Sequence, residues 1–185
     1  MTDVSRRHAS GPGQDEPEPD PESVARSIAL RKLAAAPQTR AQLDEAMAKR
    51  GVPEVVREHV LRRFTDVGLI DDAMFARTWV ESRQAGRGLA RRALAHELRR
   101  RGVDSAVVED AVAEIDPEAE QAKARELVAR RLASSRGLDP EKRTRRLAGM
   151  LARKGYPAGV AYRVVREALE AEGVREDDLP VEHEW

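Results

Sequence analysis

Cysteine is absent from this 185-residue chain, and aromatic residues make up only 3% of it. Without a thiol, neither a disulfide nor a cysteine-ligated zinc ion can hold the fold together. The chain has no apolar run close to the roughly 20 residues of a membrane-spanning helix, and its polar, proline-rich N-terminus lacks the apolar core of a signal peptide. We therefore expect a cytoplasmic protein that makes no contact with a membrane.

Charge and helix-forming residues, by contrast, are abundant. Hydrophobic residues make up 41% of the chain and charged residues 36%, a mixture typical of helices rich in Ala, Leu, Arg and Glu. No segment alternates apolar and polar residues over five or more positions between turn signals, as a half-buried strand would. The sequence therefore predicts an all-α fold.

A pattern repeated around three glycines indicates how these helices are organised. It reads Leu-x3-Leu/Met-x3-Gly-Val/Tyr-x3-Val, and its copies lie 51 and 53 residues apart. The pattern predicts three tandem three-helix repeats, similar to helix-turn-helix units, that form an elongated curved array. The competing interpretation is that unrelated amphipathic helices show similar stripes. The positions in register are Leu43, Met47, Gly51, Val52, Val56 and Val60; Leu94, Leu98, Gly102, Val103, Val107 and Ala111; and Leu147, Leu151, Gly155, Tyr156, Val160 and Val164.

Helix start signals give the boundaries of the repeats. The first helix is expected to begin after Ser23. Thr39 and Gln42 form a capping box for the second helix, and the paired acids Asp71 and Asp72 are expected to cap the first helix of the second repeat. The predicted repeats cover residues 23–70, 71–116 and 117–171.

Both ends of the chain are acidic. Residues 1–22 hold six acids against two arginines, without apolar periodicity, which predicts a disordered, proline-rich arm. The last 19 residues hold eight acids against Arg175 alone, and we expect an acidic tail over residues 172–185. Such segments commonly serve solubility; the alternative is that they screen a basic surface from non-specific binding.

No catalytic or metal-binding motif stands out. His96 and Glu97 do not begin a zinc motif of the HExxH type, because an arginine stands where its second histidine would be. The glycines of residues 86–88 lack the Lys-Ser/Thr pair of a phosphate loop. Asp71 and Asp72 could hold magnesium, but capping explains them more simply. We expect a protein that is not an enzyme and that uses neither a metal nor a cofactor.

Arginine is the strongest functional signal. Between residues 73 and 102, eight arginines face only Glu81 and Glu97, which leaves a local charge of +6 in a chain of zero net charge. A charge run is commonly a solvated helix face, but a second set of basic residues recurs in the third repeat. A continuous basic groove would bind nucleic acid or an acidic protein surface, and the pattern does not separate these. The candidate contact residues are Arg83, Arg87, Arg91, Arg92, Arg99, Arg100, Arg101, Arg143, Arg146, Arg153 and Lys154.

Two aromatic residues precede this basic run. Phe75 and Trp79 lie four residues apart, at helical spacing. Because such stripes usually face inward, we expect both in the core with Leu94 and Leu98, and not as a platform on which bases stack.

Residues 69–103 carry a distinctive order of motifs. Leu-Ile-Asp-Asp is followed by Phe75-Ala76, Arg83, a glycine-rich joint and Glu-Leu-Arg-Arg-Arg-Gly-Val. This order resembles the signature of the RecX family, which regulates the RecA recombinase. The resemblance extends more weakly over residues 24–170, and Arg101 stands where many members of the family carry lysine.

The resemblance implies three tandem three-helix repeats, in agreement with the glycine pattern. It also implies a regulator without catalysis of its own, which binds in the groove of a RecA–DNA filament. Such a regulator mainly inhibits the ATPase, strand-exchange and coprotease activities of RecA in recombination and the SOS response. We accordingly expect a monomer that contacts RecA and the single-stranded or duplex DNA within the filament. The alternative is a free-standing DNA-binding protein, a transcriptional or nucleoid regulator of helix-turn-helix type.

Overall fold

The computed structural model describes residues 20–174, which form nine α-helices and one 3-10 turn and contain no strand. The all-α prediction is confirmed. The elements are α1 (Pro21–Ala35), α2 (Arg40–Ala48), α3 (Glu54–Asp66), α4 (Asp72–Arg87), α5 (Arg91–Arg100), α6 (Ser105–Ala113), α7 (Pro117–Leu132), the 3-10 turn η1 (Ala133–Ser135), α8 (Pro140–Arg153) and α9 (Ala158–Ala171).

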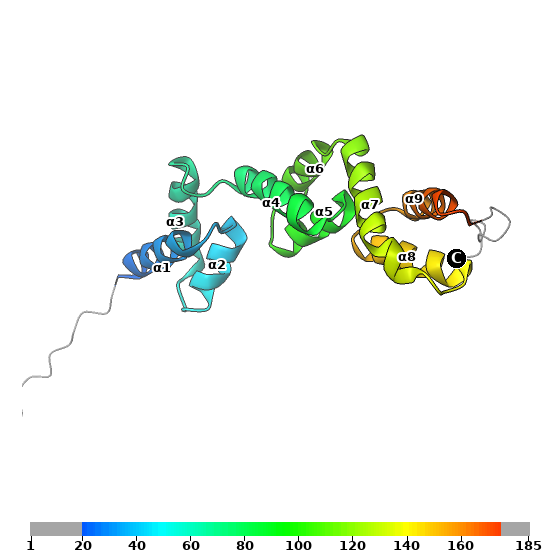
Figure 1. Ribbon diagram of the computed structural model, residues 1–185. Coiled ribbons are helices and arrows are strands. Elements are labelled where there is room, and N and C mark those ends of the chain that lie inside the picture. The colour runs from blue at the N-terminus through cyan, green and yellow to red at the C-terminus, as the bar shows by residue number, and fades with distance from the viewer. Residues whose placement is uncertain (1–19, 175–185) are drawn as a thin grey trace, which may run out of the picture.

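The helices form three successive bundles in an elongated body (Figure 1). Helices α1–α3 lie at one end, α4–α6 in the middle and α7–α9 at the other end. Each helix packs mainly against the other two helices of its own bundle, and each bundle has its own cluster of buried apolar side chains. The prediction of three tandem three-helix repeats is confirmed.

The repeated glycine pattern marks the middle helix of each repeat and the turn that ends it. The two apolar positions before the glycine are fully buried in all three repeats: Leu43 and Met47, Leu94 and Leu98, Leu147 and Leu151. Each glycine has a positive φ, between 75° and 90°, a conformation in which a Cβ is strained. The residue just before each glycine therefore lies in the same place in every repeat, in the turn that ends the middle helix.

Side chains at the helix N-termini explain where most helices begin. The capping box of α2 is present: Thr39 Oγ1 accepts from the Gln42 N–H at 3.2 Å, and Gln42 Oε1 accepts from the Thr39 N–H at 3.1 Å. Asp71 Oδ1 accepts from the Met74 N–H at 2.7 Å and so caps α4. These hydrogen bonds satisfy backbone donors that have no partner inside the helix.

The predicted start of the first helix was wrong. Helix α1 begins at Pro21, because the Asp20 carboxylate accepts hydrogen bonds from the N–H groups of Glu22 and Ser23. Proline suits this first helical position, where its missing N–H costs nothing. The signal was present in the sequence as Asp followed by Pro.

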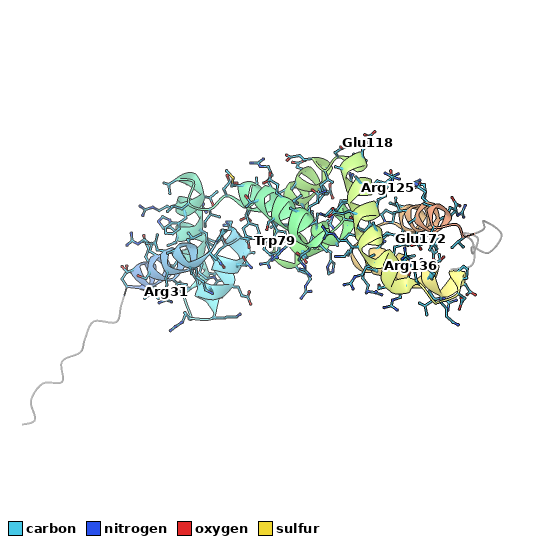
Figure 2. The ribbon with its side chains drawn as sticks, in the orientation of Figure 1. Arg31, Trp79, Glu118, Arg125, Arg136 and Glu172 are labelled. Carbon is cyan, nitrogen blue, oxygen red and sulfur yellow. The ribbon has the colours of Figure 1, made fainter. Side chains whose placement is uncertain are left out.

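The predictions for the two acidic ends fall mostly on residues 1–19 and 175–185, which lie outside the described residues. Glu172, at the start of the predicted tail, is described. It pairs with Arg136, with Oε1 2.6 Å from a guanidinium nitrogen, and with Arg143. Figure 2 shows Arg136 and Glu172 at the end of the third repeat. These hydrogen bonds hold the pKa of Glu172 below its ordinary value, so this carboxylate belongs to the fold of the repeat.

Candidate binding surface

The second repeat docks on the first through the turn that follows α5. Thr39 Oγ1 donates a hydrogen bond to the Arg101 carbonyl at 2.7 Å. Next to it, a Cβ added at Gly102 would lie 2.3 Å from a side-chain atom of α2. Asp72 Oδ1 accepts from the Arg40 N–H at 2.9 Å. Asp72 therefore caps the middle helix of the first repeat, whereas the sequence had placed both of its paired acids at the start of their own helix.

The third repeat docks on the second in the same way. The Ala90 N–H donates to the Lys154 carbonyl at 2.9 Å, and Glu120 Oε1 accepts from the Arg91 N–H at 2.6 Å. A Cβ added at Gly155 would lie 2.5 Å from a backbone nitrogen of α5. At both junctions, the glycine turn after the middle helix of the later repeat lies against the start of the middle helix of the earlier repeat, and a basic residue precedes the glycine in each turn. An acid from the first helix of the later repeat caps that same middle helix of the earlier repeat.

Four of the predicted contact residues meet beside the first junction. They line a hollow of about 360 Å³ together with Gln42, Trp79 and Glu97. Glu97 is the one acid among the lining residues, and it lies 3.8 Å from Arg83 and 3.3 Å from Arg87. Three positive charges are therefore in excess. We call this group the basic cluster: Arg83, Arg87, Arg100 and Arg101.

Trp79 lies within the basic cluster, so its assignment to the core was only partly right. Its indole packs against the edge of the core and is half-buried, and its Nε1 donates to Glu97 at 3.0 Å. The guanidinium carbons of Arg101 and Arg83 lie 3.7 and 4.1 Å from the ring centroid, within the range of cation–π attraction. Phe75 stacks on the indole at 5.8 Å between centroids. Figure 2 shows Trp79 where the second repeat meets the first.

The cationic surface continues from the basic cluster to the third repeat. Lys154 Nζ donates to the Arg87 carbonyl at 2.5 Å, at the C-terminus of α4, where a cation is favoured by the helix dipole. Burial, together with the positive charges of Arg87, Arg131 and Lys123, holds the pKa of Lys154 below its ordinary value. Cations of both repeats therefore act on one another across the second junction.

Four further candidates are exposed on the outer faces of the middle helices. Arg92 and Arg99 lie seven residues apart on α5, and Arg146 and Arg153 do the same on α8, a spacing that puts each pair on one face. None of the four makes an ion pair with a residue that the structure describes. They are exposed basic side chains that do not line the hollow of the basic cluster.

Two candidates have structural roles instead. Arg143 is only 7% exposed and binds Ser135 Oγ at 3.1 Å as well as Glu172. Its predicted place in the binding surface was wrong, because an unpaired buried guanidinium would be costly and the fold of the third repeat uses this one. Arg91 donates to the Ile115 carbonyl at 2.8 Å and lies 3.5 Å from Glu120, so it belongs to the second junction.

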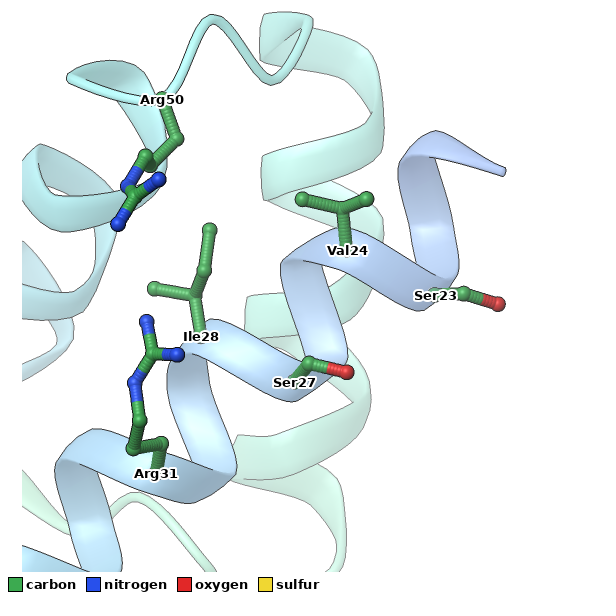
Figure 3. Close-up of a pocket in the computed structure, with 6 residues that line it drawn as sticks. All are labelled: Ser23, Val24, Ser27, Ile28, Arg31 and Arg50. Carbon is green, nitrogen blue, oxygen red and sulfur yellow. The ribbon is translucent and has the colours of Figure 1, made fainter. Parts of the chain in front are cut away.

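Sequence reasoning missed basic residues in the first repeat. Arg31 and Arg50 line a pocket of about 280 Å³ above Ile28, and Figure 3 shows both guanidinium groups directed toward it. Arg50 precedes Gly51 as Arg101 precedes Gly102, so the register of the repeat was the signal that could have found it. The cationic character of the turn is thus shared by all three repeats.

No group of three or more His, Asp and Glu side chains within residues 20–174 is placed to hold a metal ion. No helix of this same range is long and apolar enough to cross a membrane.

The fold defines a protein of tandem three-helix repeats, with basic side chains at both junctions between them. Family models of RecX match each repeat: the first three-helix domain over residues 25–64, the second over 71–112 and the third over 118–165. The chain belongs to the RecX family of regulatory proteins.

Similar proteins agree with this assignment. Regulatory protein RecX of Streptomyces coelicolor is 60% identical over 158 residues, which cover 85% of this chain and 84% of the relative. Regulatory protein RecX of Thermobifida fusca is 61% identical over 153 residues, 83% of each chain. The crystal structure of RecX from Lactobacillus salivarius has a TM-score of 0.74 at 17% identity and covers 80% of this chain and 96% of that one, so its likeness concerns the fold.

Proposed function

We propose that this protein binds RecA–DNA filaments as a monomer and mainly inhibits the ATPase, strand-exchange and coprotease activities of RecA in recombination and the SOS response. The observation that carries the proposal is the basic cluster, in which four arginines face one glutamate. Membership of the RecX family supports RecA as the partner. The protein acts by binding and contributes no catalysis.

The elongated shape suits a filament. A filament offers the same surface again at each subunit, and three repeats in a row can meet more than one of them (Figure 1). Linked contacts of this kind raise the overall affinity without any single strong contact. Arginines that meet DNA phosphates release counterions, so binding should weaken steeply with salt.

Charge reversal tests the proposal. The variant Arg99→Glu/Arg100→Glu changes two exposed side chains that make no ion pair among the described residues, so its helicity and melting temperature should stay close to those of the unmodified protein. We expect its inhibition of the DNA-dependent ATPase of RecA to require at least about tenfold more protein, because each lost charge-assisted contact costs on the order of 1–3 kcal/mol.

The matched control is Arg62→Glu/Arg163→Glu, which makes the same change in net charge on α3 and α9, away from the basic cluster. It should inhibit nearly as well as the unmodified protein. Equal losses in the two variants would mean that only net charge matters, and full inhibition by Arg99→Glu/Arg100→Glu would remove Arg99 and Arg100 from the interface.

A gel shift with duplex and single-stranded DNA, without RecA and across salt concentrations, addresses the free-standing DNA-binding alternative. The proposal expects weak binding without sequence preference. Tight binding to one duplex sequence would favour the alternative.

A further inference from the structure

A second hollow adjoins the basic cluster, between the first and second repeats. It encloses about 550 Å³, a size common for binding pockets. Leu33 and Pro37 of the first repeat line one side; Leu69, Met74 and Trp79 line the other. Its charged lining residues are Arg83 and Arg101, which also line the hollow of the basic cluster, and Asp71, whose carboxylate caps α4. We call it the Trp79 cleft.

The apolar wall of this cleft is exposed to solvent. Leu69 is 49% exposed and Met74 56%, and both line the cleft together with the buried Phe75. Each exposed apolar side chain forgoes about 25 cal/mol per Å² that burial would return. A partner that inserts an apolar side chain between the repeats recovers this energy.

The two arginines that line the cleft have N–H donors without an acceptor among the described residues. Arg83 makes one long ion pair, 3.8 Å from its Nε to Glu97. Because this Nε is buried, the terminal N–H groups of Arg83 are the donors left for another acceptor. Arg101 has the indole of Trp79 as its partner, and a cation over an aromatic ring keeps its N–H donors for other acceptors. Both guanidinium groups can therefore bind carboxylates.

We propose that the Trp79 cleft binds a protein segment of the filament, an acidic stretch that carries one bulky apolar side chain. This rests on the proposed function and names the chemistry of one contact. A nucleic acid is the poorer fit, because the indole already has Phe75 stacked on it and two guanidinium groups over it, and a wall of Leu69 and Met74 offers phosphates no donor. An acidic segment matches the arginines, and its apolar side chain matches the wall.

The second junction shows that docking of the repeats does not require such a cleft. Asp72 and Glu120 cap the middle helix of the preceding repeat in the same way. Trp79 follows Asp72 by seven residues and Leu127 follows Glu120 by seven, so the two residues occupy the same position in their repeats. There Leu127 packs directly against Gly88, with a side-chain carbon 2.9 Å from the place a Cβ would take. The apolar residue at this position therefore contacts the preceding turn at the second junction, whereas Trp79 lines the cleft at the first.

The first test removes the apolar wall and keeps every charge. Because Leu69 and Met74 are exposed, Leu69→Ser/Met74→Ser should fold normally, which circular dichroism and thermal melting check. We expect its affinity for RecA–DNA filaments to fall at least about tenfold, while its binding to single-stranded DNA alone stays the same.

The control Val55→Ser/Leu138→Ser changes two other exposed apolar residues and should bind filaments normally. Unchanged filament affinity of Leu69→Ser/Met74→Ser overturns the inference. If the unmodified protein binds no filament, the proposed function fails instead.

The second test needs no filament. In a Trp185→Phe background, Trp79 is the sole tryptophan, so its fluorescence reports on the cleft. We titrate a seven-residue peptide of glutamates around one phenylalanine, the same peptide with serine for phenylalanine, and oligothymidylate. The phenylalanine peptide should shift the emission at concentrations at least about tenfold lower than the serine peptide, and oligothymidylate should leave it unchanged. A shift with oligothymidylate but not with the peptide assigns the cleft to nucleic acid and overturns the inference. A tenfold gain in peptide affinity on deletion of residues 175–185 would also overturn the inference, because it would assign the cleft to the chain's own acidic segment.

Discussion

The two junctions between repeats share one set of docking contacts and differ in what fills the space beside them. In both, an acid of the later repeat caps the preceding middle helix, at Arg40 and at Arg91. In both, a glycine turn lies so close to that helix that a Cβ would overlap with it. Because these hydrogen bonds and close contacts join particular backbone atoms of neighbouring repeats, they fix where one repeat meets the next.

The second junction is also closed by side chains. The Tyr156 hydroxyl donates to the Gly88 carbonyl at 3.3 Å, and burial raises the pKa of Tyr156 to about 12. Leu127 packs on the same glycine, and Lys154 binds the Arg87 carbonyl. At the first junction the corresponding space is the Trp79 cleft. The comparison teaches that one docking geometry is compatible with a hollow at the first junction and with direct side-chain contacts at the second, where Leu127 takes the position of Trp79.

The largest expected effect comes from replacing the glycines of the turns. Gly155→Ala would place a Cβ 2.5 Å from a backbone nitrogen of α5, and backbone cannot move aside as a flexible side chain does. We expect a loss of about 3 kcal/mol in the free energy of unfolding, from left-handed strain of about 1 kcal/mol and overpacking of about 2 kcal/mol. Gly102→Ala should cost nearly as much. Urea denaturation followed by circular dichroism measures both.

Gly51→Ala separates strain from docking. Gly51 has a φ of 75°, like Gly102 at 77°, but a Cβ there would meet nothing within 4 Å. It should cost only about 1 kcal/mol, the strain alone. Three equal losses would show that the glycines serve the turns only and that the close approach of the repeats contributes nothing.

A smaller effect is expected from removing the acids that cap across the junctions. Glu120→Ala leaves the Arg91 N–H without its acceptor and also removes the ion-pair partner of the Arg91 guanidinium. We expect a loss of about 2 kcal/mol, typical of a hydrogen bond to a charged group. Asp72→Ala removes a longer hydrogen bond and should cost about 1 kcal/mol, as the loss of a helix cap does. Thermal unfolding of the two variants measures the difference. A larger loss for Asp72→Ala would mean that the capping acid stabilises the first junction more than the second.

Much of the fold could be predicted from the sequence because its signals are local. The glycine pattern and the apolar residues at helical spacing act within one helix and its turn, so Leu94, Leu98 and Gly102 could be placed correctly from their neighbours alone. The cap at Asp71 is equally local. The start of α1 was misplaced, since the Asp20-Pro21 signal was passed over for Ser23, and Asp72 caps α2 instead of its own helix.

The binding surface was harder to predict because its geometry depends on residues far apart in sequence. Arg143 was expected on the surface, but its partner Glu172 lies 29 residues away. The ring of Trp79 receives Arg83 from the next turn of the same helix, which the sequence could have shown, and Arg101 from another element, which it could not. Charge density along a sequence thus indicated where basic side chains gather but did not separate exposed arginines from those that hold the fold.

The smallest expected effect concerns pH and the first junction alone. Burial is the main influence on the Asp72 carboxyl and raises its pKa above the ordinary 3.8, against the opposing hydrogen bond from Arg40. A raised pKa means that the folded state holds the proton more tightly, so the stability that Asp72 contributes is complete below pH 3.8 and is lost as the pH rises through the folded value. The free energy of unfolding of the unmodified protein, minus that of Asp72→Asn, should therefore fall as the pH rises above the ordinary 3.8, as measured by urea denaturation at each pH. Gly51→Ala removes no titrating group, so its difference from the unmodified protein should stay constant over the same range. A difference for Asp72→Asn that grows with pH would mean that the carboxylate's bond to α2 outweighs its burial, and the first junction would then be held as firmly by charge as the second.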